Sequence, residues 1–219
     1  PIVVVAPTPA LLSKVVAPEI VKKFTIEFKV GETVSMDNVI SKLSAMGYER
    51  VEMIQGRGQF AVRGGILDIY PLTSEYPYRL EFFDEEVDSI RQFLLEDQRS
   101  IEKLDKVLVG PAREVVYDEK TAKNASIAIA DELKQRQAVL KSLGNEELAQ
   151  HLSEKVETHI EKLSNGLFFE AAELYISHLY PDLCTIMDYF ENRFISILVE
   201  PGRIKEAQKN AAFEVEETY

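Results

Sequence analysis

The fold of this chain is decided by two stretches, GQFAVRGGILDIYP at residues 58–71 and YRLEFFDEEVDSIR at residues 78–91. Within both, apolar and polar side chains alternate, which is the pattern of a half-buried β-strand. The turn-forming pairs Gly64-Gly65 and Asp84-Glu85 divide each stretch into two strands. The two stretches therefore predict consecutive hairpins of a small antiparallel sheet.

Further elements are predicted around these hairpins. Strands are expected at residues 24–30, 50–54 and 106–109. Ser35 is placed to cap a helix that ends at Gly47 and carries apolar residues on one face: Val39, Ile40, Leu43 and Met46. Residues 25–109 are thus predicted to form a compact module of one antiparallel sheet and one helix.

The segments on either side of this module follow another pattern. Residues 2–6, IVVVA, and residues 194–199, FISILV, are continuous apolar runs typical of strands buried on both faces of a parallel sheet. Residues 1–24 are therefore expected to belong to a larger α/β domain whose earlier part is absent from this chain. Residues 110–219 are expected to continue this α/β domain with helices and further α/β structure. The fold class expected for the chain is therefore an α+β module inserted in part of an α/β domain.

Several helices are predicted after Gly110-Pro111. One apolar stripe comprises Ile129, Leu133, Leu140 and Leu143, and a second comprises Leu148, Leu152, Val156, Ile160 and Leu163. Gly144-Asn145 and Asn165-Gly166 separate these helices from their neighbours. A third helix is expected over residues 168–179, and the acidic end of the chain, up to Tyr219, is also expected to be helical.

Composition narrows the range of functions. The 219 residues carry a formal net charge of -12, and such an acidic surface repels phosphate backbones, so we expect weak non-specific binding to nucleic acids. A single cysteine, Cys184, and three separated histidines favour a reducing cytoplasm and predict neither a disulfide framework nor a metal site. No apolar run has the length of a membrane span, so no membrane partner is expected.

The chain offers no obvious catalytic group. Carboxylates are concentrated in residues 75–97, where eight of them accompany two arginines. General acid–base catalysis requires two carboxyl groups in different environments, whereas these are predicted to lie at a solvated hairpin. The glycine pairs match no phosphate-binding loop. We therefore interpret residues 75–97 as an acidic sheet edge and expect no catalytic residue and no cofactor.

Strand alternation assigns side chains to the two faces of the sheet. Tyr78, Leu80 and Phe82 are predicted to face the core, and Arg79, Glu81 and Phe83 the opposite, outer face. In the preceding hairpin, Phe60 and Val62 are predicted to point inward, and Ala61 and Arg63 outward.

An aromatic side chain beside arginines on an outer face is typical of an interaction hot spot. Phe83 lies four residues from Arg79, about 13 Å along a strand. If the outer-face assignment holds, replacing Arg63, Arg79 or Phe83 should weaken partner binding and hardly affect folding. In the alternative interpretation, a β-bulge beside Asp84 turns Phe83 into the core. Alternation alone does not decide between the two.

Residues 58–71 and 78–91, with Gln98-Arg99-Ser100, closely resemble the N-terminal region of the bacterial transcription-repair coupling factors (Mfd). That region is itself similar to the excision-repair helicase UvrB. The resemblance covers most of the chain and is weakest after Val116. It implies an interaction domain for the damage-recognition protein UvrA, inserted in a degenerate helicase-type α/β domain.

The resemblance also implies particular residues. In that family the contact with UvrA rests on two arginines and a phenylalanine, which fall here on Arg63, Arg79 and Phe83, and this favours the exposed position of Phe83. In UvrB, an acidic pair that binds magnesium follows the strand equivalent to residues 194–199. Here Glu200-Pro201 stands in its place, so ATP hydrolysis is not expected.

The resulting hypothesis is a non-catalytic adaptor region that recruits UvrA to lesions where RNA polymerase has stalled. The resemblance implies that the motor domain and the regions that bind RNA polymerase and DNA belong to parts of the parent protein outside this chain. Two alternatives stay open at this point. One is a fragment of a UvrB-type DNA helicase, and the other is an autoinhibitory module that docks on the parent's own C-terminal region.

Overall fold

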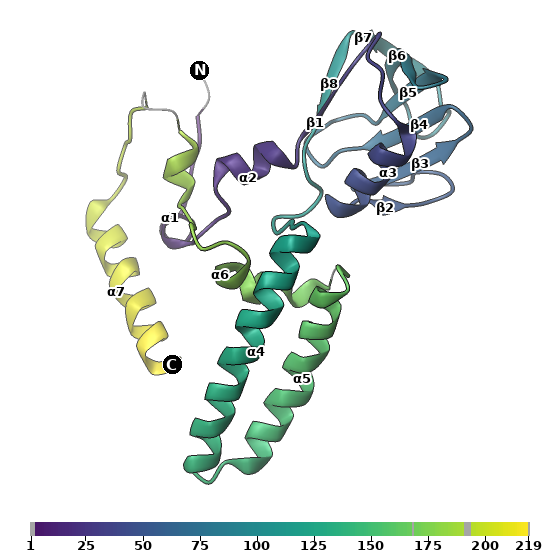
Figure 1. Ribbon diagram of the computed structural model, residues 1–219. Coiled ribbons are helices and arrows are strands. Elements are labelled where there is room, and N and C mark those ends of the chain that lie inside the picture. The colour runs from purple at the N-terminus through teal and green to yellow at the C-terminus, as the bar shows by residue number, and fades with distance from the viewer. Residues whose placement is uncertain (1–2, 168, 191–193, 219) are drawn as a thin grey trace. The chain divides into compact units, whose positions relative to one another are not determined.

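The computed structural model describes residues 3–167, 169–190 and 194–218, which divide into two compact units. One unit comprises Val21–Leu179, and the other joins the first twenty residues to Tyr180–Tyr219 (Figure 1). The larger unit contains the sheets and a long helical hairpin. It is described first because it holds the residues expected to bind a partner.

The main sheet of the larger unit has six strands. Its order is β2 (Glu49–Arg50), β3 (Gln59–Arg63), β4 (Ile66–Tyr70), β5 (Tyr78–Phe83), β6 (Glu86–Phe93) and β7 (Ser100–Leu104). All neighbours pair antiparallel except β2 and β3, which are parallel. The two expected hairpins are therefore confirmed. The strand expected over residues 50–54 is reduced to two residues, and β7, which is mostly exposed, was not predicted.

A second, two-stranded sheet joins the two ends of the module. Its strands are β1 (Ile26–Lys29) and β8 (Lys106–Val109). They pair antiparallel, with Ile26 opposite Val109 and Lys29 opposite Lys106. The chain therefore enters and leaves the module side by side.

The main core lies between one face of the six-stranded sheet, the small sheet and helix α3 (Met36–Ala45). Its completely buried side chains include Phe28, Leu43, Phe60, Leu67 and Leu80. Ser35 precedes α3 as expected, but its side chain makes no capping hydrogen bond. Gly47 follows the helix with a left-handed φ of 89°, which glycine adopts without the steric cost of a side chain.

The opposite face of the sheet carries a small cluster of its own. Ile54, Ala61 and Phe93 are buried there, with Val51, Tyr70 and Leu95 packed against them. Ala61 does lie on the outer face, as alternation predicts, but it is only 1% exposed. This part of the outer face is therefore covered by residues 51–54 and Phe93 and is not open to solvent.

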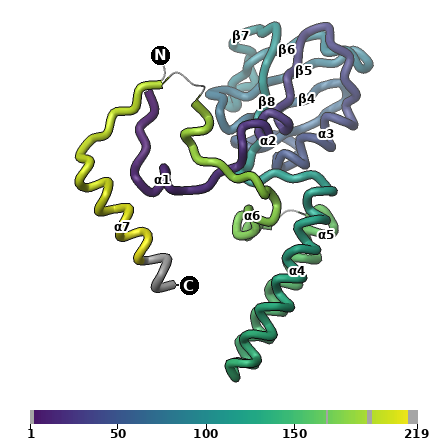
Figure 2. Tube along the Cα trace, turned by 60° about the vertical axis from the view of Figure 1, so that its left-hand side comes forward, coloured from purple at the N-terminus to yellow at the C-terminus, as the bar shows by residue number. Residues whose placement is uncertain are grey.

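A hairpin of two long helices follows the module, α4 (Glu119–Ser142) and α5 (Glu146–Ser164). The two helices pack side by side in Figure 1, and α5 lies behind α4 in the view of Figure 2. Asp118 caps α4 by accepting a hydrogen bond from the Thr121 backbone, at 2.8 Å, and it pairs with Lys23 at 2.7 Å. The Lys23 contact and the capping bonds lower the pKa of Asp118 to about 2. Leu143 and Leu148, expected on the packed stripes, are 68% and 55% exposed because they flank the turn at Gly144.

The helix expected over residues 168–179 takes a different form. Phe168 lies outside the described residues, and the segment after it consists of a 3-10 helix, η1 (Glu170–Tyr175), followed by the short helix α6 (Ile176–Leu179). The His159 ring stacks on Phe169, with centroids 4.8 Å apart, and its Nδ1 lies 2.8 Å from the Tyr175 hydroxyl. These contacts hold η1 against α5.

The smaller unit contains helices α1 (Thr8–Leu12) and α7 (Pro201–Thr218), the 3-10 helix η2 (Ile186–Tyr189) and the first part of α2 (Pro18–Lys23). The strands expected at residues 2–6 and 194–199 are absent from the described residues of both segments. Val3, Val5, Ile195 and Ile197 are between 81% and 91% exposed. The prediction was wrong because a buried strand requires neighbouring strands, and no described segment pairs with either run as a ladder.

Candidate functional site

The outer face of the sheet holds a row of polar side chains across neighbouring strands. Asp68 on β4 lies opposite Arg79 on β5, and Arg79 lies opposite Arg91 on β6. Arg63, at the end of β3, is two residues from Ala61, the cross-strand partner of Asp68, and so shares this face. Sheet pairing thus places two arginines around a single carboxylate.

Asp68 is the centre of this arrangement. Its side chain is only 1% exposed, yet both carboxylate oxygens have partners. Arg79 donates from Nε to Oδ1 at 2.7 Å and from Nη2 to Oδ2 at 2.8 Å, and Arg63 donates from Nη2 to Oδ2 at 2.8 Å. A buried carboxylate is stable only when it is paired in this way. Asp68 therefore ties β3 and β5 together through their arginines.

Arg79 makes further contacts besides those with Asp68. Its Nη2 also donates to Oε1 of Gln98 at 2.7 Å, and its guanidinium lies over the Phe93 ring at 4.3 Å. Gln98 adopts a left-handed φ of 62° and donates its side-chain amide to the Leu95 carbonyl. Hydrogen bonding to Asp68 raises the pKa of Arg79. With a side chain only 18% exposed, Arg79 is fixed in place and largely covered.

Arg63 and Arg79 therefore differ in what they can offer to a partner. The Arg63 side chain is 48% exposed and has one hydrogen bond, to Asp68. Replacing Arg79 is therefore expected to affect folding, contrary to the expectation from the sequence, because Arg79 provides most of the pairing of a buried charge.

Phe83 is the most exposed aromatic side chain of this face. It ends β5 and is 79% exposed, whereas Phe82 beside it packs against the main core. A register shift does occur after Glu81, as the bulge alternative supposed, but it does not turn Phe83 inward. The predicted facing of Tyr78, Leu80 and Phe82 toward the core, and of Arg79, Glu81 and Phe83 away from it, is confirmed.

The turn after Phe83 is fixed by backbone contacts. Asp84 has a left-handed φ of 56°, the Val34 backbone donates to the Glu85 carbonyl at 2.7 Å, and Thr33 bridges to Glu86. On the other side, the Phe82 backbone donates to the Gly65 carbonyl at 2.7 Å. Phe83 is thus presented to solvent by a rigid backbone, which reduces the entropy lost when a partner binds it.

Gly65 is required by the close approach of β4 and β5 at this point. A Cβ at residue 65 would lie 2.8 Å from the Phe82 carbonyl oxygen, so one backbone would have to move. We expect Gly65→Ala to lower the free energy of unfolding by about 1–3 kcal/mol, measured by urea denaturation. Gly56→Ala is the control, since nothing lies within 4 Å of its added Cβ. Equal effects of the two changes would contradict this account.

A second polar network lies beside the first. Ser89 donates to Oε2 of Glu81 at 2.8 Å, and Arg91 donates from Nη2 to the same oxygen. Two arginines directly opposite each other, such as Arg79 and Arg91, repel. Here each has its own carboxylate, Asp68 or Glu81, which offsets that repulsion. Glu81 is therefore part of an ion-paired face and not of a fully solvated acidic edge.

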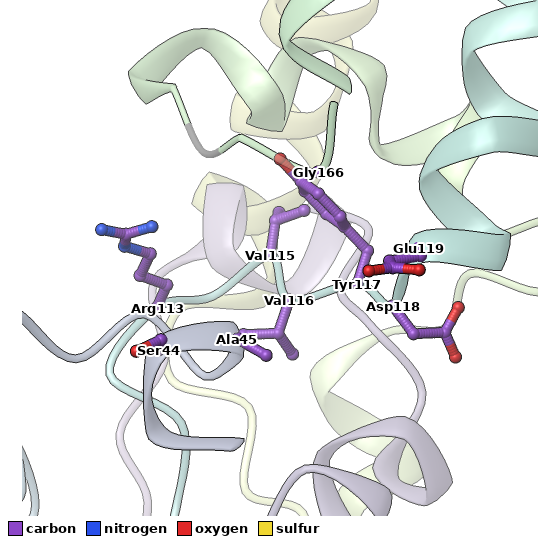
Figure 3. Close-up of a pocket in the computed structure, with 9 residues that line it drawn as sticks. All are labelled: Ser44, Ala45, Arg113, Val115, Val116, Tyr117, Asp118, Glu119 and Gly166. Carbon is purple, nitrogen blue, oxygen red and sulfur yellow. The ribbon is translucent and has the colours of Figure 1, made fainter. Parts of the chain in front are cut away.

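The larger unit also has a pocket of about 360 Å³ where the module meets the helical hairpin. It is lined by residues from the end of α3, by Arg113, by residues 115–119 and by Gly166 (Figure 3). The Tyr117 hydroxyl donates to the Leu167 carbonyl at 3.3 Å. The Asp118 carboxylate in this pocket already accepts a hydrogen bond from the Thr121 backbone and forms an ion pair with Lys23. Among the described residues, no group of three or more His, Cys, Asp or Glu could hold a metal ion.

Comparison with known proteins shows what the sheet module is similar to. Residues 26–115 match the family model described as the UvrB interaction domain, and these bounds begin at β1 and end shortly after β8. The outer-face residues described above, from Arg63 to Gln98, all lie inside this matched segment.

The chain as a whole is similar to transcription-repair-coupling factors. It is 37% identical over 207 residues to that of Bacillus subtilis, which covers 94% of this chain and 17% of the relative. It is 34% identical over 201 residues to that of Staphylococcus haemolyticus, with 91% and 17% covered. The chain therefore spans about a sixth of the length of these relatives. The expected resemblance to the coupling factors is confirmed.

Two important residues of the site were not predicted from the sequence. A single carboxylate in an alternating strand, such as Asp68, is usually solvated, and the role of Gln98 depends on a loop after β6 that local sequence does not specify. One signal was present: Asp68 shares the outer face with Arg63, five residues earlier, across a tight glycine turn.

Among the helices of the described residues, none combines the length and the apolar character that a membrane span requires.

Proposed function

We propose that the UvrB interaction domain of this chain binds UvrA through Phe83 and the neighbouring arginines, Arg63 and Arg79. The chain would act as a non-catalytic adaptor, and its longer parent would bring UvrA to lesions where RNA polymerase has stalled. The observation that carries this proposal is Phe83 itself, a phenylalanine that is 79% exposed at the end of β5, the strand that also carries the ordered Arg79.

Physical chemistry supports the choice of this face. A large aromatic side chain in solvent gains free energy when a partner's pocket covers it, and aromatic and arginine side chains are enriched in binding hot spots. The protein is acidic overall, with a net charge of -12, whereas the Arg63–Asp68–Arg79 cluster has one positive charge in excess. Within this acidic chain, the cluster is the part of the outer face that can attract a carboxylate of a partner.

The direct test is titration of purified UvrA against the 219-residue chain by calorimetry. We expect saturable binding that Phe83→Ala weakens. Val139→Ala on α4 provides a control, because Val139 is also an exposed apolar residue, at 47%, but lies outside the UvrB interaction domain. Binding that responds equally to both changes, or no binding at all, would contradict the proposal.

We expect no ATP hydrolysis by this chain. Glu200 stands where the helicase would hold its magnesium-binding acids, but its carboxylate pairs with Arg203 at 3.1 Å and Pro201 begins helix α7. Phosphate release from ATP should stay at background. Turnover above background that is lost in Glu200→Gln would contradict this prediction and would revive the helicase alternative.

A further inference from the structure

We propose that Asp68 is a positioning residue of the docking surface, the outer-face region that comprises Arg63, Arg79 and Phe83. Asp68 holds the Arg63 side chain so that its guanidinium can bind a carboxylate of the partner. This inference rests on the proposed function and adds to it the chemistry of the partner's contact. It also gives the two arginines different roles: Arg63 binds the partner's carboxylate in a bidentate manner, and Arg79 contributes chiefly by anchoring Asp68.

The first step is a count of hydrogen-bond donors. A guanidinium has five N–H bonds, and two on the same edge are needed to bind a carboxylate in a bidentate manner. Arg79 uses Nε and Nη2 for Asp68 and the second hydrogen of Nη2 for Gln98, so no complete edge is left. Arg63 uses a single Nη2–H for Asp68, which leaves one complete edge for another carboxylate.

The second step concerns orientation. A free arginine at a strand end would lose much side-chain entropy when a partner fixes it. The Arg63 side chain is already held at 2.8 Å by Asp68, and Asp68 is in turn immobilised by burial and by two bonds from Arg79. The arginine that is 48% exposed is therefore ordered before the partner arrives.

Positioning and simple charge attraction predict opposite results for one substitution. Asp68→Asn keeps the size of the side chain but removes a negative charge, so it makes the cluster more positive. If charge alone attracted the partner's carboxylate, this change would tighten binding. If Asp68 orients Arg63, the change weakens binding because the charged acceptor that fixes the guanidinium is lost.

The experiment measures the affinity of UvrA for the 219-residue chain with and without Asp68→Asn, each in the Arg63 and the Arg63→Ala backgrounds. We expect Asp68→Asn to weaken binding about 5–10-fold in the Arg63 background and less than about 2-fold in the Arg63→Ala background. Tighter binding, or an equal loss in both backgrounds, would overturn the inference. Circular dichroism of each variant establishes that the proteins compared are folded.

A second variant keeps the test decisive if Asp68→Asn does not fold. Arg63→Lys retains the positive charge at an exposed position but has no planar edge, so it cannot bind Asp68 and grip a second carboxylate with the same geometry. We expect it to weaken binding as much as Arg63→Ala, within about 2-fold. Wild-type affinity in Arg63→Lys would overturn the inference. Failure of the proposed function can be distinguished from failure of this inference. If the proposed function fails, Phe83→Ala binds UvrA like the wild type, whereas failure of the inference concerns only the Asp68 and Arg63 variants.

Discussion

Phe83→Ala is expected to weaken UvrA binding by about 2 kcal/mol or more, close to 30-fold, as truncation of a central hot-spot residue does. Its side chain is 79% exposed, so the free energy of unfolding should stay within about 0.5 kcal/mol of wild type. Calorimetric titration with UvrA and urea denaturation of the same sample measure the two quantities. A docking residue is identified by this separation of binding from stability.

Phe82→Ala is the matched control for that result. The two phenylalanines are adjacent on β5 and equal in size, but Phe82 packs against the main core. Its truncation should cost about 3 kcal/mol of stability, at the lower end for a core phenylalanine because Phe82 is only partly buried. If Phe83→Ala instead unfolds the domain while Phe82→Ala has no effect on stability, the facing of β5 is inverted and the proposed docking surface is wrong.

Arg79→Ala is expected to lower the free energy of unfolding by about 3 kcal/mol, because it removes most of the pairing of a buried charge. Asp68 would keep only the bond from Arg63, and the Phe93 ring would lose the guanidinium above it. Urea denaturation at neutral pH measures the loss.

Arg63→Ala serves as the comparison for Arg79→Ala. It also removes one bond to Asp68, but it leaves both bonds from Arg79 in place, so the expected loss of stability is about 1 kcal/mol. A smaller loss for Arg79→Ala than for Arg63→Ala would show that Arg79 is not the anchor. Binding to UvrA should be compared between the two variants only where both are folded.

Strand alternation was sufficient to predict which residues lie on the outer face. Period-two patterns assigned Tyr78, Leu80 and Phe82 to one side and Arg79 and Phe83 to the other, and the structure agrees. The same pattern could not predict the burial of Ala61, because the residues that cover it come from another strand and from residues 51–54. Alternation identifies a face but does not show what covers that face.

The failures have a common physical origin in long-range contacts. Residues 194–199 have the composition of a buried strand, but a strand is formed by hydrogen bonds to neighbours that local sequence does not specify. The roles of Asp68 and Gln98 likewise depend on side chains from three strands and a loop. The family resemblance identified Arg63, Arg79 and Phe83 but not the different positions of the two arginines.

The antiparallel pair β1 and β8 has a mechanical consequence. The chain enters and leaves the module at the same end of this ladder, next to the pair Ile26 and Val109. Antiparallel ladder bonds run perpendicular to the strands, so tension that separates these two ends loads the bonds one at a time, starting at Ile26 and Val109 and moving toward Lys29 and Lys106. Such a ladder opens like a zipper, at a lower force than one sheared along its length. Under tension the β1–β8 pair would therefore separate before the six-stranded sheet that carries Phe83.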